Sequence, residues 1–157
     1  MIKLSKIYKS FDQSVVLSNV SLSITKNEFV CITGESGAGK TTLLNIIGLL
    51  DKPDSGDLSI YGKTNFTKNE ILNLRRNFFG YIFQDYLLMY DKTVEENISI
   101  SKNILRNKMK KQDKEDINEV MEKVGLDLSY LNKKVYQLSG GEQQKVAIAR
   151  MLLKPYE

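Results

Sequence analysis

The chain has 157 residues with 41% apolar and 27% charged side chains, which is the balance of a globular domain, and it has no histidine, which excludes imidazole chemistry. Its net charge is +4, but the densest basic stretch, residues 102–114, has no interleaved aromatic side chains, so no nucleic-acid partner is expected. No apolar run reaches the roughly 20 residues that cross a bilayer and residues 1–11 lack the apolar core of a signal peptide, so a cytoplasmic location without direct lipid insertion is expected.

The first half of the chain alternates apolar runs with turn residues. Short apolar or alternating runs predict strands, and the strand at 28–33 would bury Cys31, the single cysteine. A longer apolar run predicts a helix, and a cluster of Asp, Pro, Ser and Gly predicts a turn. The predicted strands are 20–24, 28–33, 57–62 and 78–83, the helix is 41–50 and the turn is 51–56.

The second half is predicted to be helical from about residue 92 to residue 137. One helix would turn Ile117, Val120, Met121 and Val124 to the same side, with Gly125 as its C-terminal cap. A last helix is predicted over 141–153, with Pro155 just beyond it. Strands mixed with helices indicate one α/β domain with a helical insertion.

A glycine-rich turn lies between the strand predicted at 28–33 and the helix predicted at 41–50. Its sequence, GESGAGKT at 34–41, fits the pattern G-x-x-x-x-G-K-[ST] of the P-loop. Glycines let the backbone wrap closely around a polyphosphate, and the helix start adds unpaired N–H groups. Lys40 would reach the β- and γ-phosphates, and the Thr41 hydroxyl would bind Mg²⁺. The nucleotide-binding residues predicted here are Gly34, Glu35, Ser36, Gly37, Ala38, Gly39, Lys40, Thr41 and Thr42.

A second turn of small residues opens the last helix, within LSGGEQQKVAIAR at 138–150. By itself it fits either an anion site at a helix N-terminus or a capped helix. Together with the P-loop it resembles the signature motif of ABC-type ATPases. The resemblance implies a head-to-tail pair of ATP-binding subunits, in which Ser139, Gly140, Gly141 and Glu142 of one copy complete the ATP site of the other.

The same resemblance assigns three more positions. Gln84 matches the Q-loop glutamine, a catalytic residue that contacts Mg²⁺ and the attacking water; the alternative is an exposed amide at a strand end. Phe11 matches the aromatic residue that stacks on adenine, with Val16 as a weaker candidate beside it. For Phe11 the alternatives are a plain core aromatic, or Tyr8 in its place.

The resemblance covers essentially the whole chain and is greatest to the ATPases of macrolide-exporting and lipoprotein-releasing systems, with bacteriocin exporters nearby. It implies a P-loop NTPase fold in one domain: an ATP-binding core at 1–91, a helical subdomain at 92–141 and a return to the core at 142–157. It also implies ATP and Mg²⁺ as cofactors, an integral membrane transporter subunit as partner, and a place at the inner face of the plasma membrane.

The family places an apolar strand ending in Asp, and then a catalytic Glu, after the signature helix. Here the sequence stops at LLKPYE, so we expect it to be C-terminally incomplete. The family hydrolyses ATP, but without the catalytic Glu we expect this chain by itself to be inactive, and also to be poorly soluble or incompletely folded. No other acid fits as the general base: Glu35 lies inside the glycine-rich turn and in the family points away from the reaction, Asp85 belongs to the Q-loop, and Glu142 belongs to the signature motif. One alternative is a nucleotide-binding partner without turnover. Another, a DNA-repair ATPase, is disfavoured because the segment between the two motifs has no CxxC and no heptad run.

Overall fold

A computed structural model describes residues 1–102 and 110–154. The chain forms two compact units, Met1–Arg76 and Asn77–Glu157, and each is described by itself. Most of the basic stretch at 102–114 and the predicted stop at Pro155 lie outside the described residues.

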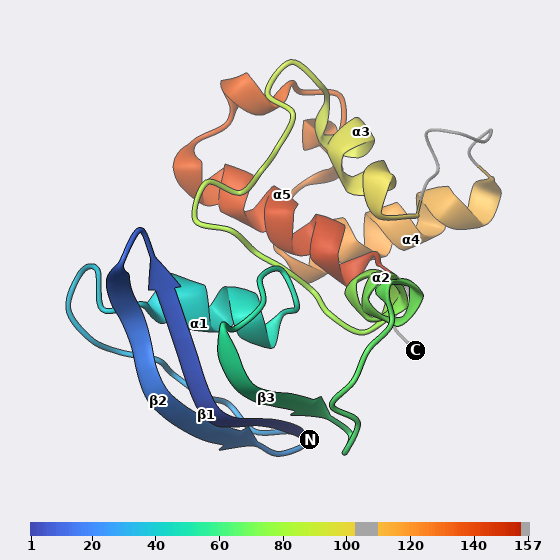
Figure 1. The fold of residues 1–157 in the computed structure, drawn as a ribbon. Coiled ribbons are helices and arrows are strands. Elements are labelled where there is room, and N and C mark those ends of the chain that lie inside the picture. The colour runs from blue at the N-terminus through green and yellow to red at the C-terminus, as the bar shows by residue number, and fades with distance from the viewer. Residues whose placement is uncertain (103–109, 155–157) are drawn as a thin grey trace. The chain divides into compact units, whose positions relative to one another are not determined.

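The first unit contains a three-stranded antiparallel sheet with the order β2-β1-β3 (Figure 1). Its strands are β1 (Ile2–Phe11), β2 (Ser14–Ile24) and β3 (Ser55–Ile60), and its helices are α1 (Lys40–Ile47) and α2 (Lys68–Asn77). The central strand β1 turns Leu4 and Ile7 into the core.

The strands predicted at 20–24 and 57–62 are confirmed within β2 and β3. The helix predicted at 41–50 is confirmed as α1 but is shorter, because Leu49 adopts a left-handed conformation with φ 59°.

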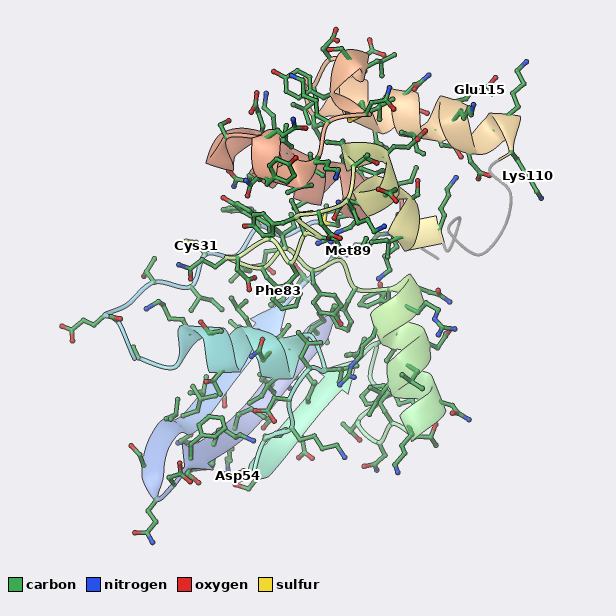
Figure 2. The ribbon with its side chains drawn as sticks, turned by 90° about the horizontal axis from the view of Figure 1, so that it is seen from above. Cys31, Asp54, Phe83, Met89, Lys110 and Glu115 are labelled. Atoms are coloured by element: carbon green, nitrogen blue, oxygen red, sulfur yellow. The ribbon has the colours of Figure 1, made fainter. Side chains whose placement is uncertain are left out.

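Two predicted strands, 28–33 and 78–83, are wrong. Residues 28–33 are irregular, with the Phe29 side chain 93% exposed, and Cys31 is exposed rather than in the core (Figure 2). Residues 78–83 are also irregular, and their rings contact one another, with Phe78 edge-on to Phe79 at 5.0 Å between ring centroids. An apolar run becomes a strand only when a neighbour completes its hydrogen-bond ladder, and neither segment has such a neighbour among the described residues.

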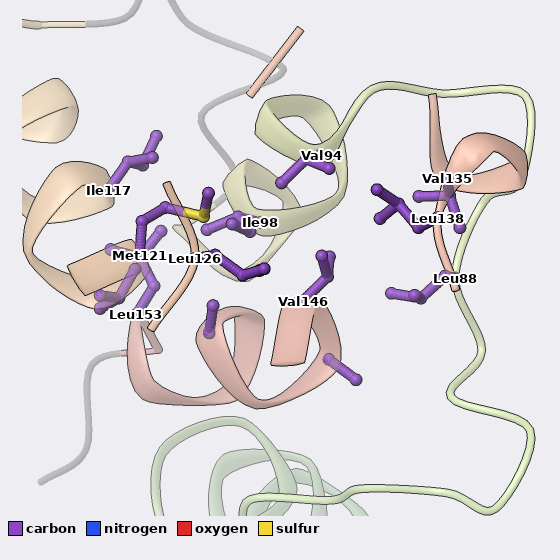
Figure 3. Close-up of a cluster of buried hydrophobic side chains, with 13 residues drawn as sticks. Leu88, Val94, Ile98, Ile117, Met121, Leu126, Val135, Leu138, Val146 and Leu153 are labelled. Carbon is purple, nitrogen blue, oxygen red and sulfur yellow. The ribbon is translucent and has the colours of Figure 1, made fainter. Parts of the chain in front are cut away.

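The second unit is helical, as the sequence predicts. Its elements are α3 (Val94–Ser99), η1 (Ile100–Lys102), α4 (Lys111–Lys123), η3 (Leu128–Tyr130), η4 (Val135–Gln137) and α5 (Gly140–Leu152). Helices α3, α4 and α5 pack around one apolar cluster, which includes Val94, Met121 and Val146 (Figure 3). The predicted face of α4 is confirmed: Ile117, Val120 and Met121 are buried, Val124 is half-buried, and Gly125 ends the helix with φ 65°.

Candidate functional site

The P-loop, residues 34–41, leads into α1 through glycines with left-handed backbone. Gly37 and Gly39 have φ of 81° and 83°, a region that side chains rarely allow. A Cβ on Gly39 would lie 2.8 Å from the carbonyl oxygen of Val16 and 2.9 Å from a methyl of Leu17, whereas a Cβ on Gly37 would meet nothing within 4 Å. A glycine is therefore required at position 39 for two reasons: the left-handed backbone conformation and the close approach of the loop to β2.

The N-terminus of α1 is uncapped. Gly39 is the N-cap residue and has no side chain to accept a hydrogen bond. The Ala38 N–H donates to the Glu35 carbonyl at 3.3 Å, and the Leu43 N–H donates to the Gly39 carbonyl at 2.9 Å. Among the described residues no acceptor meets the other amides from 34 to 42, and most of this stretch is exposed. Unpaired amides at a helix N-terminus attract anions.

The Lys40 side chain folds back over the loop. Its Nζ donates to the carbonyl oxygens of Gly34 at 2.9 Å and Glu35 at 2.5 Å, and both bonds are exposed to solvent. These acceptors are neutral, so an arriving phosphate oxygen would make a stronger, charge-assisted bond to the same ammonium group. Thr41 and Thr42 follow in the first turn of α1, and Thr41 is exposed.

Val16 lies beside the loop, because its backbone and side chain approach Gly39. Phe11 ends β1 next to the turn formed by Asp12 and Gln13, and its ring is 47% exposed and lies 5.1 Å from the Lys9 Nζ. Its exposure shows that Phe11 is not a core aromatic; Tyr8, at 40%, is not one either.

The signature turn, Leu138–Glu142, begins α5 and carries its own cap. The Glu142 carboxylate accepts from the Ser139 N–H at 2.7 Å and from the Ser139 hydroxyl at 2.8 Å, and the Glu142 N–H donates back to that hydroxyl oxygen at 3.4 Å. The other carboxylate oxygen accepts from the Tyr130 hydroxyl at 2.9 Å. Bonds from the Ser139 N–H, the Ser139 hydroxyl and then Tyr130 lower the pKa of Glu142, while the bond to Glu142 raises the pKa of Tyr130. The structure shows the helix cap, and binding of an anion at this turn stays a prediction.

The small residues of the signature turn face open space. Gly140 and Gly141 are exposed, and a Cβ built on either meets nothing within 4 Å. Their amides stand at the start of α5 without a bulky neighbour, so a second molecule could approach them closely.

Gln84 is exposed in a tight turn of the second unit. The Tyr86 N–H donates to the Phe83 carbonyl at 3.0 Å, and the Leu87 N–H donates to the Asp85 carbonyl at 2.7 Å. Tyr86 and Leu87 have φ of 58° and 44°, so two consecutive bulky residues adopt left-handed backbone, a strained arrangement. Gln84 is thus not at a strand end, because residues 78–83 form no strand.

Two side chains that the sequence analysis did not single out hold this region. Arg150 of α5 donates to the carbonyls of Tyr86 at 2.6 Å and Leu87 at 2.7 Å, and burial lowers the pKa of its guanidinium. Asn97 of α3 is fully buried and bonds through its amide group to the Met89 N–H and carbonyl. A basic residue in the last turn of a helix, such as Arg150, weakly predicts contacts with backbone carbonyls from the sequence alone. No local sequence pattern predicts the role of Asn97.

The predicted site residues fall in both units. The P-loop, Phe11 and Val16 belong to the first unit, and Gln84 and the signature turn belong to the second. In the first unit the structure brings Val16 to the P-loop, whereas Phe11 pairs with Ser14 of β2 and its ring contacts Lys9.

Comparison with known proteins defines the class. A family model described as "ABC transporter" matches residues 17–157. The "Putative ABC transporter ATP-binding protein MG065 homolog" of Mycoplasma pneumoniae is 41% identical over 98% of this chain and 34% of its own length. The "Macrolide export ATP-binding/permease protein MacB" of Campylobacter jejuni subsp. jejuni (serotype O:23/36) is 42% identical over 98% of this chain and 24% of its own length. This chain therefore spans about a third or less of these two relatives.

Solved structures agree in fold. Two structures of the cassette MJ0796, both described as dimeric and one as a post-hydrolysis state bound to ADP and Pi, superpose with a TM-score of 0.86. They are 37% and 36% identical to this chain and are matched over 99% of it and 71% of the MJ0796 chain. The chain belongs to the ABC transporter family, and the α/β fold predicted for a P-loop ATPase is confirmed. No helix in residues 1–102 and 110–154 has both the length and the apolar character needed to span a membrane.

Proposed function

We propose that this chain is the nucleotide-binding part of a bacterial ABC transporter and that it binds ATP through residues 34–42. The observation that carries this proposal is the uncapped start of α1, where unpaired amides and the Lys40 ammonium surround an exposed loop. The anion that these groups require is the triphosphate of a nucleotide. ADP and Pi in the MJ0796 structure support the choice of ligand, since that cassette is similar over nearly the whole of this chain.

In this proposal each residue has a separate role. Lys40 binds the terminal phosphates, and the Thr41 hydroxyl is a ligand to Mg²⁺. Mg²⁺ retains several waters and needs few protein ligands, so an exposed hydroxyl beside the phosphates fits it. Gln84 supplies a further oxygen toward the metal and the water. Phe11 provides an exposed ring for the adenine, with Val16 near the loop.

We further propose that a second copy binds head to tail and places its signature turn over the nucleotide. The open space at Gly140 and Gly141 would admit the γ-phosphate, with Ser139 and Glu142 holding the turn in shape. The dimeric MJ0796 structures support this pairing. The word permease in the name of MacB supports an integral membrane partner, with the chain at the inner face of the plasma membrane.

For the 157-residue polypeptide alone we propose nucleotide binding with little turnover. Glu142 already bonds to Ser139 and Tyr130, so it is not a free base. An ATPase assay beside a binding assay distinguishes this partner without turnover from an active ATPase.

The test is calorimetric titration of MgATP into the wild-type chain and Lys40→Ala. Loss of a charge-assisted contact should weaken binding roughly 10- to 100-fold. Lys26→Ala is the control, because Lys26 is an exposed lysine of the same unit. Equal affinity of wild type and Lys40→Ala, with both folded, would contradict the assignment.

A further inference from the structure

The segment that contains Gln84 is bonded on both sides, by Arg150 near the C-terminal end of α5 and by Lys154 just after that helix. After Gln84, Arg150 donates to the carbonyls of Tyr86 and Leu87. Before it, Lys154 donates to the Phe79 carbonyl and lies 5.8 Å from the ring centroid of Tyr81. All these contacts are within the second unit, and Figure 1 shows the segment that precedes α3 passing along α5.

These contacts explain why the strained turn persists. Two consecutive left-handed residues that are not glycine need support from outside the turn, and the Arg150 guanidinium binds the two carbonyls of those same residues. Lys154 follows Leu153, the C-cap residue of α5. Burial lowers the pKa of both cations, and both donate to backbone carbonyls of this segment.

Helix α5 also carries the signature turn at its other end. Ser139 is the N-cap of α5 and Arg150 stands in its last turn, so about 15 Å of continuous helix joins the two features. The turn that holds Gln84 and the turn that holds Ser139 are thereby attached to a single element.

We propose that Arg150 and Lys154 are positioning residues, which hold the Gln84 turn to the helix that begins with the signature turn. Neither residue contacts the nucleotide in this proposal; both act through Gln84. The effect expected on MgATP affinity rests on the role proposed above for Gln84. The effect expected on amide exchange in the turn does not rest on that role.

The first test measures amide hydrogen exchange by NMR in wild type, Arg150→Met and Arg150→Lys. The Tyr86 and Leu87 amides are hydrogen-bonded within the turn, so they report its order directly. Arg150→Met keeps an apolar stem without donors and should speed their exchange about tenfold or more. Arg150→Lys should restore part of the protection.

The matched control is Lys145→Met on the same helix. Lys145 also donates to a backbone carbonyl, that of Gly125 at 3.0 Å, but not to the Gln84 turn. It should leave the exchange of Tyr86 and Leu87 unchanged. If Arg150→Met fails to fold, Lys154→Met is read in the same way, through the hydrogen-bonded amides of Tyr86 and Leu87. Unchanged exchange in folded Arg150→Met, or equal acceleration by Lys145→Met, would overturn the proposal.

The second test compares ATP affinity with and without Mg²⁺. Arg150→Met should weaken MgATP binding several-fold and leave the affinity for metal-free ATP unchanged; Gln84→Ala should do the same, with no further loss in the double variant. An equal loss with and without Mg²⁺ would mean a merely structural role and would overturn the positioning claim. If wild type binds no ATP at all, the proposed function fails, while the exchange experiment still decides the positioning of the turn.

Discussion

The helices α1 and α5 both begin at turns of small residues, but they satisfy their first amides differently. The N-terminus of α5 holds the Glu142 carboxylate of its own chain, bonded to Ser139. The N-terminus of α1 has neither an acidic residue in its first turn nor a side-chain cap. An internal carboxylate already supplies much of what an external anion would offer. We infer that α1 binds phosphate by itself, whereas α5 needs a second molecule to bring the phosphate to it.

The largest effect is expected from Gly39→Ala, which would disrupt the P-loop conformation that leaves the first amides of α1 unpaired. The new Cβ would lie 2.8 Å from the Val16 carbonyl oxygen and would impose a left-handed conformation on alanine. The free energy of unfolding should fall by about 2–5 kcal/mol, with loss of ATP binding. Urea denaturation measures the first effect and calorimetry the second.

Gly37→Ala is the control for that substitution, because it shares the positive φ but meets open space. It should cost only about 1–2 kcal/mol. Equal costs at positions 37 and 39 would show that the approach to β2 does not matter.

A smaller effect is expected from Ser139→Ala, which tests whether a side-chain cap stabilises the start of α5 but not the start of α1. Because Ser139 is a true N-cap, its removal should cost about 1 kcal/mol, measured by urea denaturation. Ser36→Ala, in the P-loop, should change stability by less than about 0.5 kcal/mol, because Ser36 caps no helix. A reversed order of the two costs would mean that the caps are wrongly assigned.

The smallest effect is the pH dependence of the α5 cap. Hydrogen bonds in the folded state lower the pKa of Glu142 from its ordinary value of 4.5. The stability that the cap contributes is therefore fully present above about pH 4.5 and is lost as the pH falls below it toward the lowered pKa. The Ser139 amide proton shift, followed from pH 6 to 3, should report this titration. Glu142→Gln should abolish the titration; a midpoint above 4.5 in wild type would contradict the cap.

The sequence predicted the features whose chemistry is local. Glycines with positive φ, the apolar face of α4 and the helix that starts after Ser139 are determined by residues close together in the chain, and the structure contains all three. The residues at 28–33 and 78–83 have strand composition, but strand formation depends on a neighbour that is distant in sequence.

The side chains that fix the Gln84 turn escaped the sequence analysis for the same reason. Arg150 bonds to residues more than sixty positions earlier, and Asn97 is buried through contacts that no local pattern encodes. Polar residues with such roles are recognised only when the fold brings their partners to them.

The most direct test of the account is an NMR titration of ATP and Mg²⁺ into the isotope-labelled chain, at concentrations where ultracentrifugation shows a monomer. We predict large amide shifts at residues 34–42 and none at Ser139–Glu142, because the start of α1 has unpaired amides and no acidic side chain, whereas the start of α5 already holds the Glu142 carboxylate. Shifts centred on the signature turn, with residues 34–42 unmoved, would contradict it.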